Sequence, residues 1–336
     1  MTATRTVRIG SSHGLHARPA KIFAQAAKDS GIPVTIAKDS GKPVNAASIL
    51  GVIALAVEHG GQLYNCESLF DMAGHPVPHA IARADLRAIC VAPEVVMEFL
   101  REFLSGPQNK FPIALEAASL RLLAPIPDPS KIICIGLNYL DHCMEQNKPK
   151  PERPMLFAKF SNTIAGPQDD VEIPANTKEL DFEAELAVII GRKARRVRRE
   201  DALRHVFGYM ALQDVSARDL QRTDGQWVRA KSQDGFAPCG PCIVTADEID
   251  DPQNLRIRSI VNGKVMQDSN TSKMIFPVDE LIAYVSESVT LQPGDIISTG
   301  TPAGVGVHRE PQVLLKSGDV VEVIVEGVGT LRNRFV

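Results

Sequence analysis

Short apolar runs separated by turn residues make up most of the chain beyond residue 122. The runs are rich in β-branched and aliphatic residues and are bounded by Gly, Pro, Asn or Asp, which is typical of β-strands. Few stretches between them have helical periodicity. The pattern therefore predicts a strand-rich α/β domain over residues 123–336. The clearest runs are "KIICIGLNY", "DFEAELAVIIG", "HVFGYMALQDVS", "IRSIVNG", "DIISTG" and "VVEVIVEGVG".

The first part of the chain has a different pattern, in which strands and helices alternate. Over residues 1–61, two short apolar runs read as strands and two longer ones as helices, the second of them capped by Ser48. Residues 62–122 are mixed, with a helical stretch near 92–106, and they end in Pro-rich sequence. We therefore expect a small α+β domain over 1–61, a connecting region over 62–122, and a boundary near residue 123.

Composition restricts the class of protein. With 44% apolar and 23% charged residues, the chain has the composition of a soluble globular protein. Its longest apolar run, "ILGVIALAV", is about half the length that a membrane span needs, and six scattered cysteines fit a reducing compartment. The basic run "RKARRVRRED" has no interleaved aromatic residues, so it predicts a solvated turn. We expect a cytoplasmic protein that binds neither membrane nor nucleic acid.

Three carboxylates form the first candidate site. In "KELDFEAELAVIIG", strand alternation directs Glu183 and Glu185 to one face, with Cα atoms about 6.5–7 Å apart. Asp214 ends a further apolar run, where a strand would bring it to the rim of a sheet. Hard oxygen ligands of this kind favour Mg²⁺ or Mn²⁺. The alternative is an edge strand with two solvated glutamates.

Further candidates lie in three other stretches. His142 and Glu145 have the i, i+3 spacing that on a helix lets the carboxylate orient the imidazole as a general base, although a surface ion pair has the same spacing. Lys231, in a Gly/Pro-rich loop, could stabilise an oxyanion or simply be solvated. The glycines around Thr301 in "STGTPAGVGV" could bind a carboxylate through backbone N–H groups, or form a plain turn.

Taken in order, several motifs resemble the fumarylacetoacetate hydrolase superfamily over about residues 122–336. "NYLDHCMEQN" and "GTPAGVGVHREP" resemble its fumarylacetoacetate hydrolase domain-containing protein 2 subgroup in particular. The resemblance implies a mixed β-sandwich-roll catalytic domain, a homodimer and a Mg²⁺ or Mn²⁺ cofactor. The motifs are "LLAPIPDPSKIICIGLNYLDH", "DFEAELAVIIG", "GYMALQDVSARDLQ", "AKSQDGFAPCGP", "VNGKVMQDSNTSKMIF" and "LQPGDIISTGTPAGVGV".

The same resemblance implies an enzyme for a small 2-oxo acid that acts through a metal-stabilised enolate. Hydrolysis of a C–C bond as in acylpyruvate cleavage, oxaloacetate decarboxylation and keto–enol tautomerisation all share that enolate. The fourth metal-binding Asp of the fumarylacetoacetate hydrolases themselves has no match here, which argues against fumarylacetoacetate as substrate. The implied roles are metal binding for Glu183, Glu185 and Asp214, catalysis for His142, Glu145 and Lys231, and substrate binding for Arg218, Gln221 and Thr301.

Residues 5–60 resemble a second family, the histidine-containing phosphocarrier protein of the sugar phosphotransferase system. "HGLHARPA" and "GKPVNAASILGV" carry the resemblance, with His16 matching the phosphorylated histidine and Ser48 the regulatory serine. Arg18 begins a helix whose N–H groups would favour a phosphate on His16. The final strand and helix of that family have only poor matches after residue 60. The alternative function is therefore phosphoryl transfer or regulation through His16, with enzyme I as partner.

Overall fold

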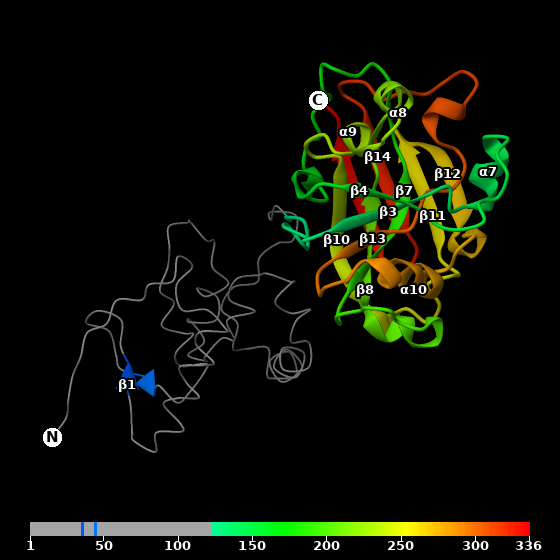
Figure 1. Ribbon diagram of the computed structural model, residues 1–336. Coiled ribbons are helices and arrows are strands. Elements are labelled where there is room, and N and C mark those ends of the chain that lie inside the picture. Colours follow the sequence, from blue (N-terminus) through cyan, green and yellow to red (C-terminus); the bar gives the residue numbers. More distant parts are fainter. Residues whose placement is uncertain (1–34, 37–43, 46–121) are drawn as a thin grey trace. The chain divides into compact units, whose positions relative to one another are not determined.

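The computed structural model describes residues 35–36, 44–45 and 122–336 (Figure 1). The chain divides into two units, Met1–Ala114 and Leu115–Val336. In the first unit, strands β1 (Thr35–Ile36) and β2 (Val44–Asn45) pair in antiparallel fashion. His16, Ser48 and the helix expected near 92–106 lie outside the described residues.

A mixed seven-stranded sheet, in the order β4-β3-β13-β7-β8-β10-β5, forms the framework of the second unit. β13 pairs in parallel with β3 and antiparallel with β7. The central β7 is buried along its whole length, so both of its faces are covered. The alternation of apolar residues in the sequence had predicted only one buried face. The strands are β3 (Ile132–Gly136), β4 (Met155–Lys159), β5 (Ile164–Ala165), β7 (Ala184–Ile190), β8 (Val206–Gln213), β10 (Ala237–Thr245) and β13 (Ile296–Ser298).

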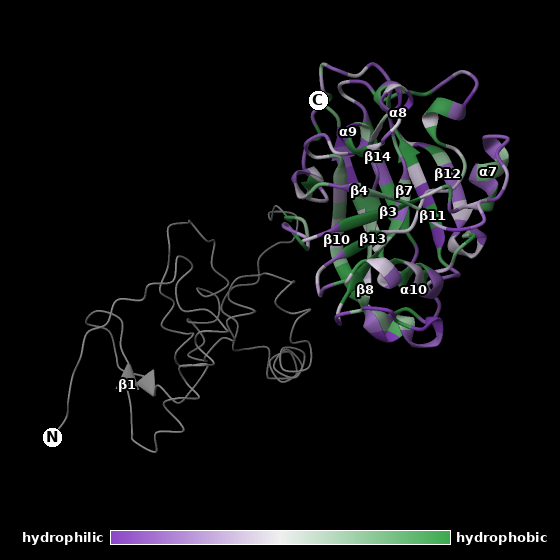
Figure 2. Cartoon of the chain, in the orientation of Figure 1, coloured by the Kyte–Doolittle hydropathy of each residue, from purple (hydrophilic) through white to green (hydrophobic). Residues whose placement is uncertain are grey.

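A four-stranded antiparallel sheet, in the order β12-β11-β14-β15, packs against the first sheet. The core between them contains buried aliphatic residues of both sheets and of helix α10 (Val278–Ser288). Figure 2 shows hydrophobic residues concentrated in strands such as β3 and β8 and hydrophilic residues in the surrounding loops. Each fully buried Val, Leu or Ile stabilises this core by about 1.5–3 kcal/mol. The strands are β11 (Arg256–Val261), β12 (Lys264–Asn270), β14 (Val320–Val325) and β15 (Gly329–Arg334).

Short elements connect the strands of the two sheets. Strands β6 (Leu180–Asp181) and β9 (Ser216–Ala217) pair with each other immediately beyond the ends of β7 and β8. The helices are α7 (Leu140–Glu145), α8 (Arg218–Asp224) and α9 (Val228–Lys231), and short 3₁₀ helices lie at Ser161–Thr163, Arg199–His205, Ala246–Glu248, Thr271–Lys273 and Gly306–His308. In the described part of the chain, every helix is too short or too polar to cross a bilayer. The strand-rich α/β architecture confirms the fold class predicted from the sequence.

Candidate active site

The three predicted carboxylates meet where β7 and β8 run side by side. Ala184 pairs with Gln213 across these strands, which places Glu183 and Glu185 on either side of the paired residue and Asp214 next to both. The backbone N–H of Asp214 donates to the carbonyl of Glu183 at 3.0 Å. Ligand oxygens of all three side chains lie within 4.8 Å of one another, and all three side chains are buried.

The structure excludes the solvated edge-strand alternative for this stretch. β7 is central in its sheet, and Glu183 lies between β6 and β7 rather than within one continuous strand. The break also divides the apolar residues, because Phe182 packs in a second core cluster while Ala184 packs between the two sheets. Burying carboxylates is costly unless something positive accompanies them.

Three cationic side chains supply part of that positive charge. The Lys231 ammonium donates to Glu183 Oε2 and Asp214 Oδ2, both at 2.7 Å, and the Lys159 ammonium donates to Asp214 Oδ1 at 2.5 Å. Arg218 donates from Nη2 to Glu183 Oε1 at 2.5 Å. Lys231 ends helix α9 rather than lying in the expected loop, because the chain turns helical directly after Trp227. Asp214 and Glu183 are therefore fully paired.

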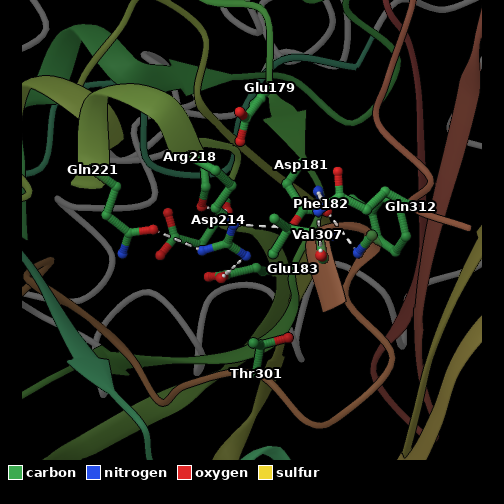
Figure 3. A network of polar contacts seen from close by, with 12 residues as sticks. Glu179, Asp181, Phe182, Glu183, Asp214, Arg218, Gln221, Thr301, Val307 and Gln312 are labelled. Atoms are coloured by element: carbon green, nitrogen blue, oxygen red, sulfur yellow. Dashed lines mark hydrogen bonds and ion pairs between the residues drawn. The ribbon is translucent and has the colours of Figure 1, made fainter. Parts of the chain in front are cut away.

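Arg218 connects this cluster to α8. Its Nε donates to Asp181 Oδ2 at 2.8 Å and its Nη1 to Gln221 Oε1 at 3.0 Å (Figure 3). The guanidinium is thus hydrogen bonded to three side chains and held rigidly at the beginning of the helix. Arg218, for which substrate binding was predicted, also lines the pocket.

Glu183 and Glu185 differ in electrostatic environment although only one residue separates them. Burial alone would raise the pKa of Glu183, but the charges of Arg218 and Lys231 outweigh burial and lower it well below its usual range. Burial, together with repulsion from Asp214 and Glu183, raises the pKa of Glu185 to about 8. Hydrogen bonds from Ser298 Oγ at 2.5 Å and the Gly300 N–H at 2.9 Å only partly offset this.

The donor set fits a divalent cation. Three hard carboxylate oxygens converge, and among the described residues Glu185 makes no ion pair that would neutralise it. A cation placed beside Glu185 would supply the missing positive charge and favour its ionised form. The cluster contains four carboxyl groups, Asp181, Glu183, Glu185 and Asp214, and three cationic side chains, Lys159, Lys231 and Arg218. Its net charge is zero while Glu185 is protonated and one negative once Glu185 ionises.

We expect metal affinity to depend on pH through Glu185. Because its pKa is raised to about 8 in the metal-free protein, the carboxyl is protonated at neutral pH and a cation must displace that proton. Mg²⁺ affinity should therefore rise about tenfold per pH unit between pH 6 and 8 and level off above pH 8. Isothermal titration calorimetry at several pH values measures this. An affinity that stays constant over that range would contradict the assignment of Glu185.

The second predicted pair lies on helix α7. The His142 ring Nδ1 lies 2.8 Å from Glu145 Oε2, and the imidazole is buried, so the pair is not the solvent-exposed ion pair that was the alternative. The Gly304 N–H donates to Glu145 Oε1 at 2.8 Å. Both oxygens of Glu145 are therefore engaged, which fixes the imidazole in one orientation.

The glycine-rich loop after β13 binds carboxylates of the protein itself. Its N–H groups donate to Glu185 from Gly300, to Glu145 from Gly304 and to Asp181 from Gly306. Gly300 has a φ of +98°, and a Cβ there would lie 2.8 Å from the Asn138 Cβ, so only glycine suits this position. The Thr301 hydroxyl donates to the Ala184 carbonyl at 2.9 Å. The loop thus connects both predicted sites.

One pocket of 280 Å³ collects most of the predicted residues. Asp214 and Glu145 do not line it and support residues that do. The centroid of the His308 ring lies 6.0 Å from that of the His142 ring. Burial lowers the pKa of His308. The predicted residues that line the pocket are His142, Glu183, Glu185, Arg218, Gln221, Lys231 and Thr301, joined by Gln146, Lys148, Arg222, Trp227 and His308.

Three further residues that contact the site were not predicted from the sequence. Lys159 lies at an inward position of β4, where alternation with exposed Leu156 and Ala158 marks it as a buried lysine. Asp181 binds Arg218 and the loop, and "LDFEAE" offers an alternating acidic pattern that includes it. Gln146 follows His142 by four residues, which on a helix brings the side chains together.

The fold and the buried carboxylate site together define a class of protein. A family model described as fumarylacetoacetate (FAA) hydrolase C-terminal matches residues 131–336. The chain belongs to this family and is an enzyme of the fumarylacetoacetate hydrolase type. A second model, described as PTS HPr component phosphorylation site, matches residues 3–64.

Individual relatives are about half identical to this chain over the aligned residues. The mitochondrial oxaloacetate tautomerase fahd2 of Xenopus laevis is 51% identical over 249 residues, which cover 70% of this chain and 78% of that protein. The mitochondrial oxaloacetate tautomerase FAHD2A of Homo sapiens is 48% identical over 224 residues, covering 66% and 71%.

Solved structures are similar as well. Fumarylacetoacetate hydrolase from Exiguobacterium antarcticum has a TM-score of 0.65 and 41% identity, covering 75% of this chain and 87% of its own. The 2-hydroxyhepta-2,4-diene-1,7-dioate isomerase from Mycobacterium marinum has a TM-score of 0.59 and 43% identity, covering 67% and 82%.

Proposed function

We propose that this enzyme interconverts the keto and enol forms of oxaloacetate with the help of Mg²⁺ or Mn²⁺. The observation that carries the proposal is a buried carboxylate triad, two members of which line one pocket together with an imidazole oriented by Glu145. Relatives named oxaloacetate tautomerases, at 48–51% identity, support this substrate over other 2-oxo acids.

The chain's own residues account for the proton transfer. A cation bound by the triad would supply positive charge that favours the enolate form of a 2-oxo acid. His142 lines the pocket with Nδ1 directed to Glu145, so Nε2 is the nitrogen that takes the C3 proton. The electron pair of the broken C–H bond forms the C2–C3 double bond, and the carbonyl electrons move to the C2 oxygen. His142 then returns the proton to that oxygen, which gives the enol.

Charge favours a small dicarboxylate. A divalent cation that displaces the Glu185 proton would change the net charge of the cluster from zero to one positive, because four carboxylates then face three cationic side chains and the cation. Lys148 and Arg222 also line the pocket. A short 2-oxo dicarboxylate places one carboxylate near the triad and leaves the other for these cations.

A substrate panel with the full-length protein tests the proposal. With Mg²⁺ present, we expect the enol absorbance of oxaloacetate to relax faster than pyruvate forms by decarboxylation, and faster than any acylpyruvate is cleaved. Chelating the metal should remove the acceleration. If oxaloacetate is neither tautomerised nor decarboxylated and acylpyruvates stay intact, the substrate class is wrong. Predominant acylpyruvate cleavage would instead favour a hydrolase.

We also propose three parts for the chain: a phosphocarrier-like segment over 1–61, a connecting region over 62–122 and a catalytic domain over 123–336. The match of residues 3–64 to the phosphocarrier model supports the first part and a role for His16 with enzyme I. We expect weak labelling of His16 by enzyme I and phosphoenolpyruvate, since the sequence matches the end of that fold poorly. Rapid stoichiometric labelling that is lost in His16→Ala would favour the carrier function.

We also propose that the protein is a homodimer. β4 is an edge strand of the large sheet, and Leu156 on it and Phe160 just after it are exposed apolar residues. A second copy of the chain would cover such residues.

A further inference from the structure

We propose that Gln146 is a positioning residue that sets the tautomer of His142 and covers its reactive nitrogen until substrate enters. The proposal deepens the proposed function, since it concerns the base of that reaction. It rests on a contact that the fold builds from one short helix. Gln146 Nε2 lies 2.7 Å from His142 Nε2, on the side of the ring opposite Glu145.

The spacing of two residues of α7 and of Gln146, which caps its C-terminal end, creates this arrangement. Glu145 and Gln146 follow His142 by three and four residues, so both side chains return to the face that carries the imidazole. The Glu145 carboxylate can only accept, so the ring carries a proton on Nδ1, and in the neutral imidazole the lone pair is on Nε2. In that tautomer the Gln146 amide, whose Nε2 lies 2.7 Å away, donates to the lone pair. Both neighbours favour the same neutral tautomer.

The helix end holds Gln146 in place. Asn147 adopts a left-handed φ of +54°, its N–H donates to the Met144 carbonyl at 3.1 Å, and the Lys148 N–H donates to the Cys143 carbonyl at 2.9 Å. These two bonds form a Schellman motif, in which Asn is one of the few residues that tolerate the left-handed position. The backbone of Gln146 is thereby fixed at the last turn, and its side chain lines the pocket beside His142.

A glutamine can serve both protonation states of the imidazole. While Nε2 carries a lone pair, the amide N–H donates to it, and substrate must displace the amide before proton transfer begins. Once Nε2 is protonated, rotation about the last side-chain torsion presents Oε1 as an acceptor, and that torsion is broad and roughly two-fold. A methionine can do neither, and a glutamate can only accept. These differences distinguish a tautomer-setting role from simple packing.

Nuclear magnetic resonance of the ¹⁵N-labelled imidazoles in the metal-free, full-length protein tests this directly. His142 signals are assigned by their loss in His142→Ala. In the wild type we expect a protonated Nδ1 and a hydrogen-bonded, unprotonated Nε2. In Gln146→Met the Nε2 signal should move to that of a free lone pair, and kcat should fall about tenfold without a rise in KM. In Gln146→Glu both nitrogens should be protonated at neutral pH, and kcat should fall about a hundredfold.

Met144→Gln is the matched control, because it places an amide on the exposed side of the same helix. It should leave both the spectrum and kcat unchanged. A wild-type His142 with its proton on Nε2 would overturn the proposal, as would a Gln146→Met variant with unaltered spectrum and kcat. The spectra need no substrate, so they test the role of Gln146 even if oxaloacetate proves not to be the substrate.

Discussion

Replacing Glu185 with Ala is expected to abolish metal-dependent turnover while the protein stays folded. Glu185 provides one of three carboxylate ligands and is the only one of them that makes no ion pair with a described cationic side chain. Its removal relieves repulsion with Asp214 and Glu183 and leaves no cation unpaired. Glu183→Ala, in contrast, would leave Arg218 and Lys231 buried and underpaired, which costs about 3–5 kcal/mol.

Turnover over a range of Mg²⁺ concentrations and the unfolding temperature of the same samples check this expectation. Glu172→Ala is the matched control, because Glu172 is exposed and does not line the pocket. It should behave as the wild type. Full activity of Glu185→Ala at low Mg²⁺ would show that the triad does not hold the catalytic metal.

His142→Ala should lower kcat by about a hundredfold or more, the usual contribution of a positioned general base. Because His142 faces the pocket and its ring nitrogens are hydrogen bonded to Glu145 and Gln146 rather than to the triad, the variant should still bind the cation. Steady-state kinetics with saturating metal, together with calorimetric titration of Mg²⁺, separate the two effects. His205→Ala serves as control, since His205 lies in the 3₁₀ helix Arg199–His205 outside the pocket. A His142→Ala variant within a few-fold of wild type would remove His142 from the mechanism.

The sequence predicted much of this site because its key residues follow local periodicity. Strand alternation directed Glu183 and Glu185 to one side, and helical spacing joined His142 to Glu145. Periodicity could not show that β7 is central and buried, since that depends on β13 arriving from more than a hundred residues away. The break before Ala184 was hidden for the same reason, because Phe182 is recruited to a second core by distant segments.

The pairing of the buried carboxylates with cationic side chains was the feature of the site that the sequence predicted least. Lys159 and Lys231 reach Asp214 from β4 and α9, which only the folded chain brings together. Substrate binding by the loop around Thr301 stays a prediction. The N–H groups of this loop donate to carboxylates of the protein, which no local pattern specifies. Gln146 follows local spacing, and only its contact with His142 indicates a role.

The central claim is that one cation at the carboxylate triad supports enol chemistry on oxaloacetate. Titrating metal-free, full-length protein with Mn²⁺ while following keto–enol interconversion of oxaloacetate tests it most directly. We predict that the rate rises from the uncatalysed value and saturates at one Mn²⁺ per chain, and that Glu185→Ala shows no such rise. A rate that is already maximal without metal, or that rises equally in Glu185→Ala, would contradict the account.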